Sequence, residues 1–269
     1  MSDPTRPKGP KIIAVANQKG GVGKTTTTIN LAAALVEAGL RVLIVDIDPQ
    51  GNASTGLGVA PGDRTRTTYD LLLDDAPLSE IVRKTNIERL LIAPATTDLS
   101  SADLEMVANE KRSFLLHDAL RQPAIDVYAL DFVLIDCPPS LSLLTVNAMV
   151  AAHSVLVPLQ SEFFALEGLS QLMLTVRELR QTANPSLRIE GVVLTMADRR
   201  NNLSQQVETD ARAYLGDLVF QTVIPRNVRV SEAPSFALPV LEYDSASKGA
   251  QAYRALASEM LKPKVPAGA

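Results

Sequence analysis

A glycine-rich segment near the N-terminus carries the residue types that phosphate chemistry needs. It reads Lys19-Gly20-Gly21-Val22-Gly23-Lys24-Thr25-Thr26. Glycines let a loop curl so that its backbone N–H groups point at phosphate oxygens, while a lysine contacts the β- and γ-phosphates and a hydroxyl binds Mg²⁺. Lys24 and Thr25 supply the last two groups. The segment therefore predicts a nucleotide-phosphate site, with a glycine-rich turn that binds nothing as the simpler alternative.

The segment departs from the ordinary P-loop pattern at its start. That pattern has a glycine five residues before the terminal Gly-Lys pair, and Gln18 stands at this position. Lys19 follows it directly. The loop is therefore a variant with a second lysine beside the glycines.

Carboxylates stand where two predicted strands end. Asp46 and Asp48 close one apolar run, and Asp136 closes another. An open α/β sheet has its ligand crevice at the carboxyl ends of its strands, and in P-loop NTPases an Asp at such an end holds Mg²⁺. Asp46 and Asp48 point the same way because side chains alternate along a strand. We expect metal and phosphate chemistry here, with capping of turns or helices as the alternative.

The elements that must position these residues alternate along the chain. Apolar runs predict strands over 11–16, 41–46, 90–93, 132–136, 154–158 and 189–195. Helical patterns occupy 24–38, 103–120, 141–151, 166–182, 202–215 and 249–261. Strands that are apolar on both faces are typical of a parallel sheet covered by helices. The pattern predicts an α/β fold, a doubly wound, mostly parallel sheet with helices on both faces, as in P-loop NTPases.

One domain is expected over residues 11–262. Residues 1–10 hold three prolines and no apolar run, so we expect a mobile N-terminal tail, and 263–269 form the expected C-terminal tail. Residues 51–78, rich in Gly, Thr and Asp, are expected to be a mobile surface loop. Residues 233–243 carry two prolines and are expected to meander before the last helix.

Composition excludes several classes of protein. Of 269 residues, 46% are hydrophobic and 21% are charged, which fits neither a disordered chain nor a membrane protein. No run reaches the ~18 apolar residues of a membrane-spanning helix, and no secretory signal is present, so a cytoplasmic protein is expected. The single cysteine, Cys137, excludes an intrachain disulfide and a metal site made of cysteines alone.

Five segments in order resemble the ParA/MinD family of deviant Walker A P-loop ATPases, and within it the ParA or Soj type. They are KGGVGKTT, VDIDPQGN, FVLIDCPPS, Val157-Pro158 with FALEG at 164–168, and VIPRNVRVSEAPS. The resemblance covers nearly the whole chain. It implies an ATPase that is weak until stimulated, with ATP and Mg²⁺ as its ligands.

The resemblance also implies roles for single residues. Lys19 matches the signature lysine, which reaches across a nucleotide-sandwiched homodimer to the partner's ATP. Asp48 would position the attacking water and, with Thr25 and Asp136, surround the Mg²⁺. Asp46 would support the loop or the metal shell. The residues expected to hold the base are Met196, Pro225 and Asn227.

The net charge of −4 argues against strong DNA binding by the chain as a whole. From Arg180 onward, however, 11 Lys and Arg stand against 9 Asp and Glu. The resemblance implies nonspecific double-stranded DNA binding by the dimer, and pairing two basic surfaces raises affinity steeply through counterion release. The expected phosphate contacts are Arg200, Arg226, Arg229 and Lys248, with Arg199 and Arg254 further out.

The function implied is DNA segregation during chromosome or plasmid partitioning, with a ParB-like centromere-binding protein as the stimulating partner and nucleoid association in the ATP-bound state. Two alternatives stay open: a ParA-like positioning ATPase for a protein complex such as a chemotaxis cluster, and a P-loop scaffold that binds nucleotide without hydrolysing it.

A MinD-like membrane helix is not expected, because prolines interrupt the segment 261–269. A cluster shared between two cysteines per chain, as in nitrogenase iron proteins, is excluded because the chain has one cysteine.

Overall fold

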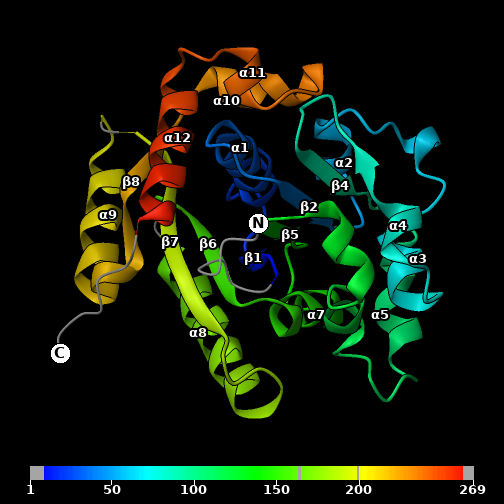
Figure 1. The fold of residues 1–269 in the computed structure, drawn as a ribbon. Coiled ribbons are helices and arrows are strands. Elements are labelled where there is room, and N and C mark those ends of the chain that lie inside the picture. The colour runs from blue at the N-terminus through cyan, green and yellow to red at the C-terminus, as the bar shows by residue number, and fades with distance from the viewer. Residues whose placement is uncertain (1–8, 163–164, 199, 263–269) are drawn as a thin grey trace.

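An eight-stranded sheet runs through the molecule (Figure 1), in the order β3-β4-β2-β5-β1-β6-β7-β8. The computed structural model describes residues 9–162, 165–198 and 200–262. Only β3 and β4 pair antiparallel, which confirms the mostly parallel sheet. The strands are β1 (Lys11–Val15), β2 (Val42–Asp46), β3 (Arg83–Lys84), β4 (Leu90–Ala93), β5 (Phe132–Asp136), β6 (Ser154–Gln160), β7 (Arg188–Ala197) and β8 (Val219–Pro225).

Helices cover both faces of the sheet, as the alternation predicted. Successive strand residues such as Ile12 and Ile13 enter different apolar cores, because strand side chains alternate between faces. One core is closed by α1 (Lys24–Glu37), α2 (Asn52–Gly56), α10 (Val228–Glu232), α11 (Val240–Tyr243) and α12 (Lys248–Leu261). The other is closed by α3 (Thr68–Leu73), α4 (Leu78–Ile81), α5 (Leu99–Met106), α6 (Leu115–Ala119), α7 (Leu143–Ala151), α8 (Ala165–Thr182) and α9 (Asn202–Leu215).

One predicted helix and the set of predicted strands differ from the structure. The helix expected over 103–120 is two helices, α5 and α6, separated by a turn in which Asn147 donates to the backbone carbonyl of Arg112. The strands β3 and β8 were not among the predicted strands. The expected tails 1–10 and 263–269 lie outside the described residues, apart from Gly9 and Pro10.

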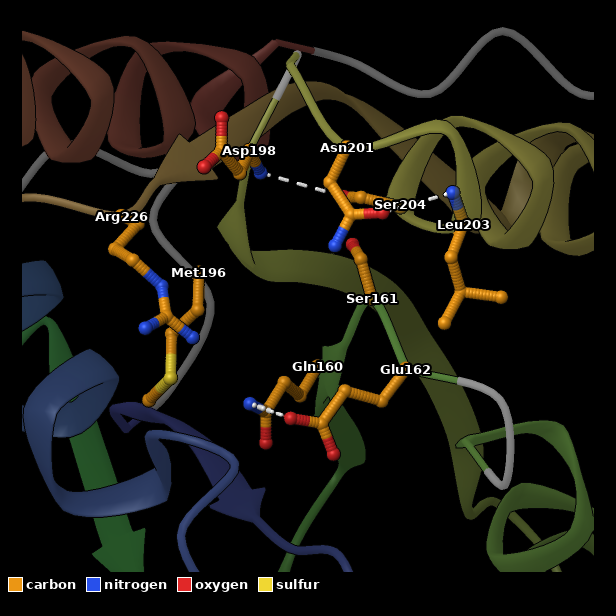
Figure 2. Close-up of a pocket in the computed structure, with 9 residues that line it drawn as sticks. All are labelled: Gln160, Ser161, Glu162, Met196, Asp198, Asn201, Leu203, Ser204 and Arg226. Atoms are coloured by element: carbon orange, nitrogen blue, oxygen red, sulfur yellow. Dashed lines mark hydrogen bonds between the residues drawn. The ribbon is translucent and has the colours of Figure 1, made fainter.

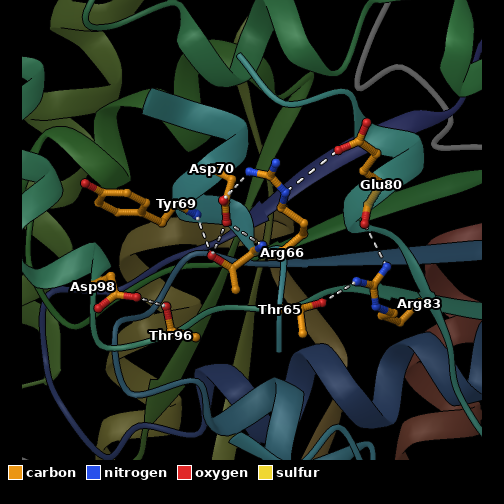
Figure 3. A network of polar contacts seen from close by, with 9 residues as sticks. Thr65, Arg66, Tyr69, Asp70, Glu80, Arg83, Thr96 and Asp98 are labelled. Carbon is orange, nitrogen blue, oxygen red and sulfur yellow. Dashed lines mark hydrogen bonds and ion pairs between the residues drawn. The ribbon is translucent and has the colours of Figure 1, made fainter. Parts of the chain in front are cut away.

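The expected surface loop at 51–78 is wrong, because this segment folds into α2, a 3₁₀ turn (Pro61–Asp63) and α3. Thr67 and Asp70 form a capping box at the start of α3. Figure 3 shows the surrounding polar contacts, including Arg66 paired with Asp70 and Arg83 donating to the Glu80 carbonyl. Composition suggested a loop because Gly, Thr and Asp serve helix caps as well as loops.

The centre of β7 is closely packed at Gly191. A Cβ atom placed on this buried residue would lie 2.4 Å from the Phe220 ring of β8. Gly62, in the exposed turn 61–63, has nothing within 4 Å of such an atom. The close approach of the two strands therefore depends on the missing side chain at position 191.

We predict that Gly191→Ala lowers the free energy of unfolding by about 1–3 kcal/mol, because the added methyl group overpacks against Phe220. Gly62→Ala is the matched control and is expected to match the wild type within about 0.5 kcal/mol. Urea unfolding followed by circular dichroism measures both. Equal stability of the two variants would show that β7 and β8 separate without cost.

Candidate functional site

The glycine-rich segment forms a loop between β1 and α1, as expected. Gly21 and Gly23 have φ angles of 74° and 87°, in the left-handed region that favours glycine. The helix α1 starts directly after, where the Thr27 N–H donates to the Gly23 carbonyl at 2.8 Å. The loop therefore ends at a helix N-terminus, whose free N–H groups and dipole favour an anion.

Two side chains that the sequence analysis did not single out fasten this loop to the sheet. Asn17 donates to the Pro158 carbonyl of β6 at 2.8 Å, and its Oδ1 accepts the Lys19 N–H at 3.1 Å. Thr195 of β7 donates to the Val22 carbonyl at 2.8 Å. The signal available in the sequence was their position at the ends of two apolar strands. The loop is therefore fixed from both sides before any ligand binds.

Lys24 is a buried cation with no carboxylate within ion-pair distance among the described residues. Its side chain is 6% exposed, and its Nζ donates to the Lys19 carbonyl at 3.0 Å. Burial lowers the pKa of the Lys24 ammonium, and the carboxylate of Asp136 opposes that shift. An ammonium group held this way attracts an anionic ligand strongly, because it has lost water without gaining a full countercharge.

Asp136, at the end of β5, has an unused oxygen. Its Oδ1 accepts the Thr28 hydroxyl at 3.0 Å, and the Thr25 hydroxyl also bonds to this carboxyl group. Oδ2 is buried and has no hydrogen-bond partner among the described residues. Burial, followed by the nearby charge of Asp46, raises the pKa of Asp136 to about 8. A bare carboxylate oxygen beside a threonine hydroxyl fits Mg²⁺, which binds hard oxygen ligands.

Asp46 and Asp48 differ in what they bind. Asp46 Oδ2 accepts the Ser54 N–H at 2.9 Å and the Ser54 hydroxyl at 2.7 Å, while Oδ1 accepts the Asp48 N–H at 3.2 Å. Burial raises the pKa of Asp46 to about 6, although the Ser54 bonds act against that shift. Asp48 Oδ1 accepts the Gln50 N–H at 3.0 Å. Asp46 is thus occupied with supporting the loop, the first of the two expected roles.

The loop after Asp48 is held by an arginine that the sequence analysis missed. Arg64 donates to the carbonyls of Val59 and Ala95 at 2.8 to 3.1 Å and to the Thr55 hydroxyl at 2.6 Å. Gly51 has a φ of 58°, and a Cβ atom there would overlap the Arg64 guanidinium group. The structure therefore fixes the segment that carries Asp48 at both of its ends.

The three expected base residues line one cavity of about 240 Å³. Met196, Pro225 and Asn227 lie there with Gly23 and Thr26 of the phosphate loop. Met196 has a φ of 52°, a strained conformation for a side chain of this kind. Asn227 Oδ1 also accepts the Val230 N–H at 3.3 Å, so the same residue caps α10. The cavity continues the phosphate loop towards β8.

The residues expected to contact DNA differ in whether an acidic side chain already pairs with them. Arg200 pairs with Asp198 at 3.2 Å, and Arg229 pairs with Glu232 at 3.0 Å and Asp244 at 3.3 Å. Arg226 and Lys248 are exposed, and Arg226 also lines the base cavity. Of the outer candidates, Arg254 pairs with Glu37 at 2.6 Å, and Arg199 lies outside the described residues. All four main candidates lie on the loops after β7 and β8 or at the starts of α10 and α12.

Among the described residues, no group of three or more His, Cys, Asp or Glu side chains could hold a metal ion by itself. No helix there is both long enough and apolar enough to cross a membrane. A metal ion at Asp136 would therefore need oxygens from other groups, such as the Thr25 hydroxyl, phosphate and water.

We predict that Asp136→Asn stabilises the ligand-free protein at pH 8 by on the order of 1–3 kcal/mol. The unfolded Asp136 carboxyl ionises near 3.8 and the folded one near about 8. Between these values the folded state binds more protons than the unfolded state, so the free energy of unfolding falls as pH rises. Asparagine stays neutral and keeps an acceptor for Thr28.

Urea unfolding at pH 5 and pH 8, without Mg²⁺ and nucleotide, measures this effect. The difference between variant and wild type should be larger at pH 8. Asp217→Asn removes an exposed carboxylate from the turn after α9 and is expected to behave as the wild type. A loss of stability in Asp136→Asn at both pH values would mean that ionised Asp136 is not a burden in the folded state.

Comparisons with known proteins agree with this geometry. A family model described as an AAA domain matches residues 10–189. The chromosome partitioning protein ParA of Caulobacter vibrioides is 56% identical over 252 residues, which cover 93% of this chain and 94% of that protein. The sporulation initiation inhibitor protein Soj of Bacillus subtilis is 51% identical over 250 residues, covering 93% and 98%.

The fold is also found among solved structures. A cobyrinic acid a,c-diamide synthase from Mycobacterium smegmatis, solved with an ATP analogue and magnesium, has a TM-score of 0.79 and 38% identity and covers 93% of both chains. The family model spans the phosphate loop and the strand-end carboxylates, and each of these relatives covers 93% of this chain. The chain belongs to the ParA/Soj family of P-loop ATPases.

Proposed function

We propose that this protein is an ATP-dependent DNA-segregation ATPase, which hydrolyses ATP to ADP and phosphate during chromosome or plasmid partitioning. The observation that carries the proposal is that two buried groups lie at the same site, Lys24 of the phosphate loop and Asp136 at the end of β5. Among the described residues, Lys24 has no ion-pair partner and Asp136 Oδ2 has no hydrogen-bond partner. One group suits phosphate and the other suits Mg²⁺. The relatives named for chromosome partitioning support the cellular role.

The residues of the loop have complementary tasks in this reaction. Lys24 leaves the Lys19 carbonyl and contacts the β- and γ-phosphates, while Thr25 and Asp136 hold Mg²⁺. Mg²⁺, when bound there, would neutralise charge on the phosphate oxygens. Asp48 orients the attacking water through its free carboxylate oxygen, so that the γ-phosphoryl group transfers in line and ADP leaves. Met196, Pro225 and Asn227 hold the base.

Pairing of two copies would complete the site. Lys19 reaches the nucleotide of the partner copy, so the homodimer forms only with ATP. Arg200, Arg226, Arg229 and Lys248 of both copies then contact DNA phosphates without reading base sequence. Because Arg200 and Arg229 already pair with acids, one copy alone binds weakly, and doubling the contacts raises affinity steeply. A ParB-like protein would stimulate hydrolysis and release, leaving nucleoid association to the ATP-bound state.

Nucleotide-dependent DNA binding tests the proposal. Co-sedimentation with double-stranded DNA should be strong with ATP and weak with ADP or no nucleotide. Lys19→Gln should reduce it to the level seen without nucleotide, because the partner's nucleotide loses its contact. DNA binding that is independent of nucleotide would overturn the switch.

The same assay locates the DNA surface. Arg200→Glu should abolish co-sedimentation while ATP-dependent dimerisation, followed by light scattering, is retained. Arg180→Glu at the end of α8 gives the same charge change away from the proposed surface and should bind as the wild type. If Arg200→Glu lost dimerisation as well, the surface would be misplaced.

Turnover separates the enzyme from a nucleotide-binding scaffold. We predict that Asp48→Ala lowers phosphate release at least about a hundredfold, because the attacking water loses its acceptor. Binding of a fluorescent ATP analogue should be retained. Asp63→Ala, at an exposed turn, serves as the control. A wild type that binds the analogue but releases no phosphate would favour the scaffold.

The alternative of a positioning ATPase for a protein complex shares every step of this cycle except the cargo. A ParB-like gene beside the coding sequence favours partitioning, whereas a chemoreceptor or adaptor gene there favours the alternative.

A further inference from the structure

Lys19 is held within its own chain at three atoms. Its N–H donates to Asn17, its carbonyl accepts from Lys24 at 3.0 Å, and its Nζ forms an ion pair with Glu162 Oε2 at 2.8 Å. Glu162 lies just after β6, across from the phosphate loop. The side chain that must reach a second copy is therefore directed towards its own sheet edge.

Glu162 is itself positioned for this contact. Its other oxygen, Oε1, accepts the Gln160 side-chain amide at 2.5 Å, and its N–H donates to the Gln160 carbonyl at 2.8 Å. Figure 2 shows the Gln160 and Glu162 side chains joined at the end of β6, beside a cavity of about 260 Å³. Both carboxylate oxygens thus have a partner, and one of these partners, Gln160, is the last residue of β6.

The Lys19–Glu162 ion pair is partly exposed to water, so it stabilises one position of Lys19 only modestly. The Lys19 and Glu162 side chains are 36% and 48% exposed, so water screens the pair. Exposed pairs of this kind shift an equilibrium by only a few-fold. The Lys19–Glu162 pair would therefore disfavour the contact of Lys19 with a second copy without preventing it.

Lys24 connects this contact to the phosphate site. The same lysine that is expected to contact phosphates now holds the Lys19 carbonyl. When Lys24 turns to a phosphate, Lys19 loses one of its three attachments, the bond to its carbonyl. The Glu162 ion pair is then the remaining side-chain restraint on Lys19.

We propose that Glu162 holds Lys19 in the nucleotide-free chain and thereby sets the ATP concentration at which two copies pair. The inference rests on the proposed function, because it assumes that Lys19 acts on a partner copy. Glu162 is a positioning residue in this scheme: it acts through Lys19 and does not touch the reacting atoms. Removing it frees Lys19 and makes pairing easier.

A zero-length carbodiimide cross-link tests the contact in the full chain. It joins a lysine amine to a carboxylate only when the two touch. The Lys19–Glu162 linkage, detected by mass spectrometry in monomeric protein, should be strongest without nucleotide and fall at least about threefold with a non-hydrolysable ATP analogue and Mg²⁺. Glu162→Gln should lack it. Absence of this intrachain linkage without nucleotide, or a yield unchanged by the analogue, would overturn the proposal.

Dimerisation tests the consequence. Glu162→Gln should pair at about two- to fivefold lower analogue concentration than the wild type, by light scattering. Glu178→Gln on α8 makes the same charge change at an exposed site and should match the wild type. An unchanged or raised threshold in Glu162→Gln would overturn the inference. A wild type that never pairs, with the cross-link still responding to the analogue, would instead contradict the proposed function and remove the threshold role with it.

Discussion

The structure depends on the free-energy cost of burying two charged side chains, Lys24 and Asp136, at the carboxyl edge of the sheet. Lys24 and Asp136 are both buried, and burial shifts the pKa of each towards its neutral form. Within the described part of the chain neither charge is compensated, since the Lys24 ammonium bonds only to a carbonyl and Asp136 keeps one oxygen without a partner. A protein tolerates such groups where a ligand supplies the missing charge. A phosphate group would supply the negative charge that Lys24 lacks, and a divalent cation would supply the positive charge that Asp136 lacks.

The surrounding fold is rigid where this chemistry needs it. Asn17 and Thr195 fasten the phosphate loop to two strands, and Arg64 fastens the segment that follows Asp48. All of these donated bonds go to neutral acceptors, namely backbone carbonyls and, for Arg64, also the Thr55 hydroxyl, so none of them places a carboxylate beside the ligand. Lys19 is the exception, because its ion pair with Glu162 is exposed and separable. The rigid contacts position the ligand, and the separable one leaves a lysine free to change partners.

The sequence predicted the elements that show a regular apolar pattern and the sites that carry a known motif. Strands β1, β2, β4 and β5 were predicted within a residue at each end, because apolar runs of that kind suit buried parallel strands. The break between α5 and α6 was missed because Asn147, far along the chain, stabilises the turn. Glu162 was missed because its partner Lys19 is distant in sequence. Arg64 was missed because a single charged residue shows no periodic pattern, although two of its partners, Thr55 and Val59, are near in sequence.

The cavity expected to hold the base and the residues expected to contact DNA meet at α10 and the start of α12. The sequence pattern does not show that these two helices touch. A Cβ atom on Gly249 of α12 would lie 2.3 Å from Val230, so α12 and α10 touch closely. Asn227 caps α10 and lines the base cavity, while Arg229 follows on the same short helix and Lys248 begins α12. A nucleotide base pressing on Asn227 would therefore act on the helix that carries Arg229. Because Gly249 lies directly against Val230, a displacement of α10 would press on the first turn of α12, next to Lys248.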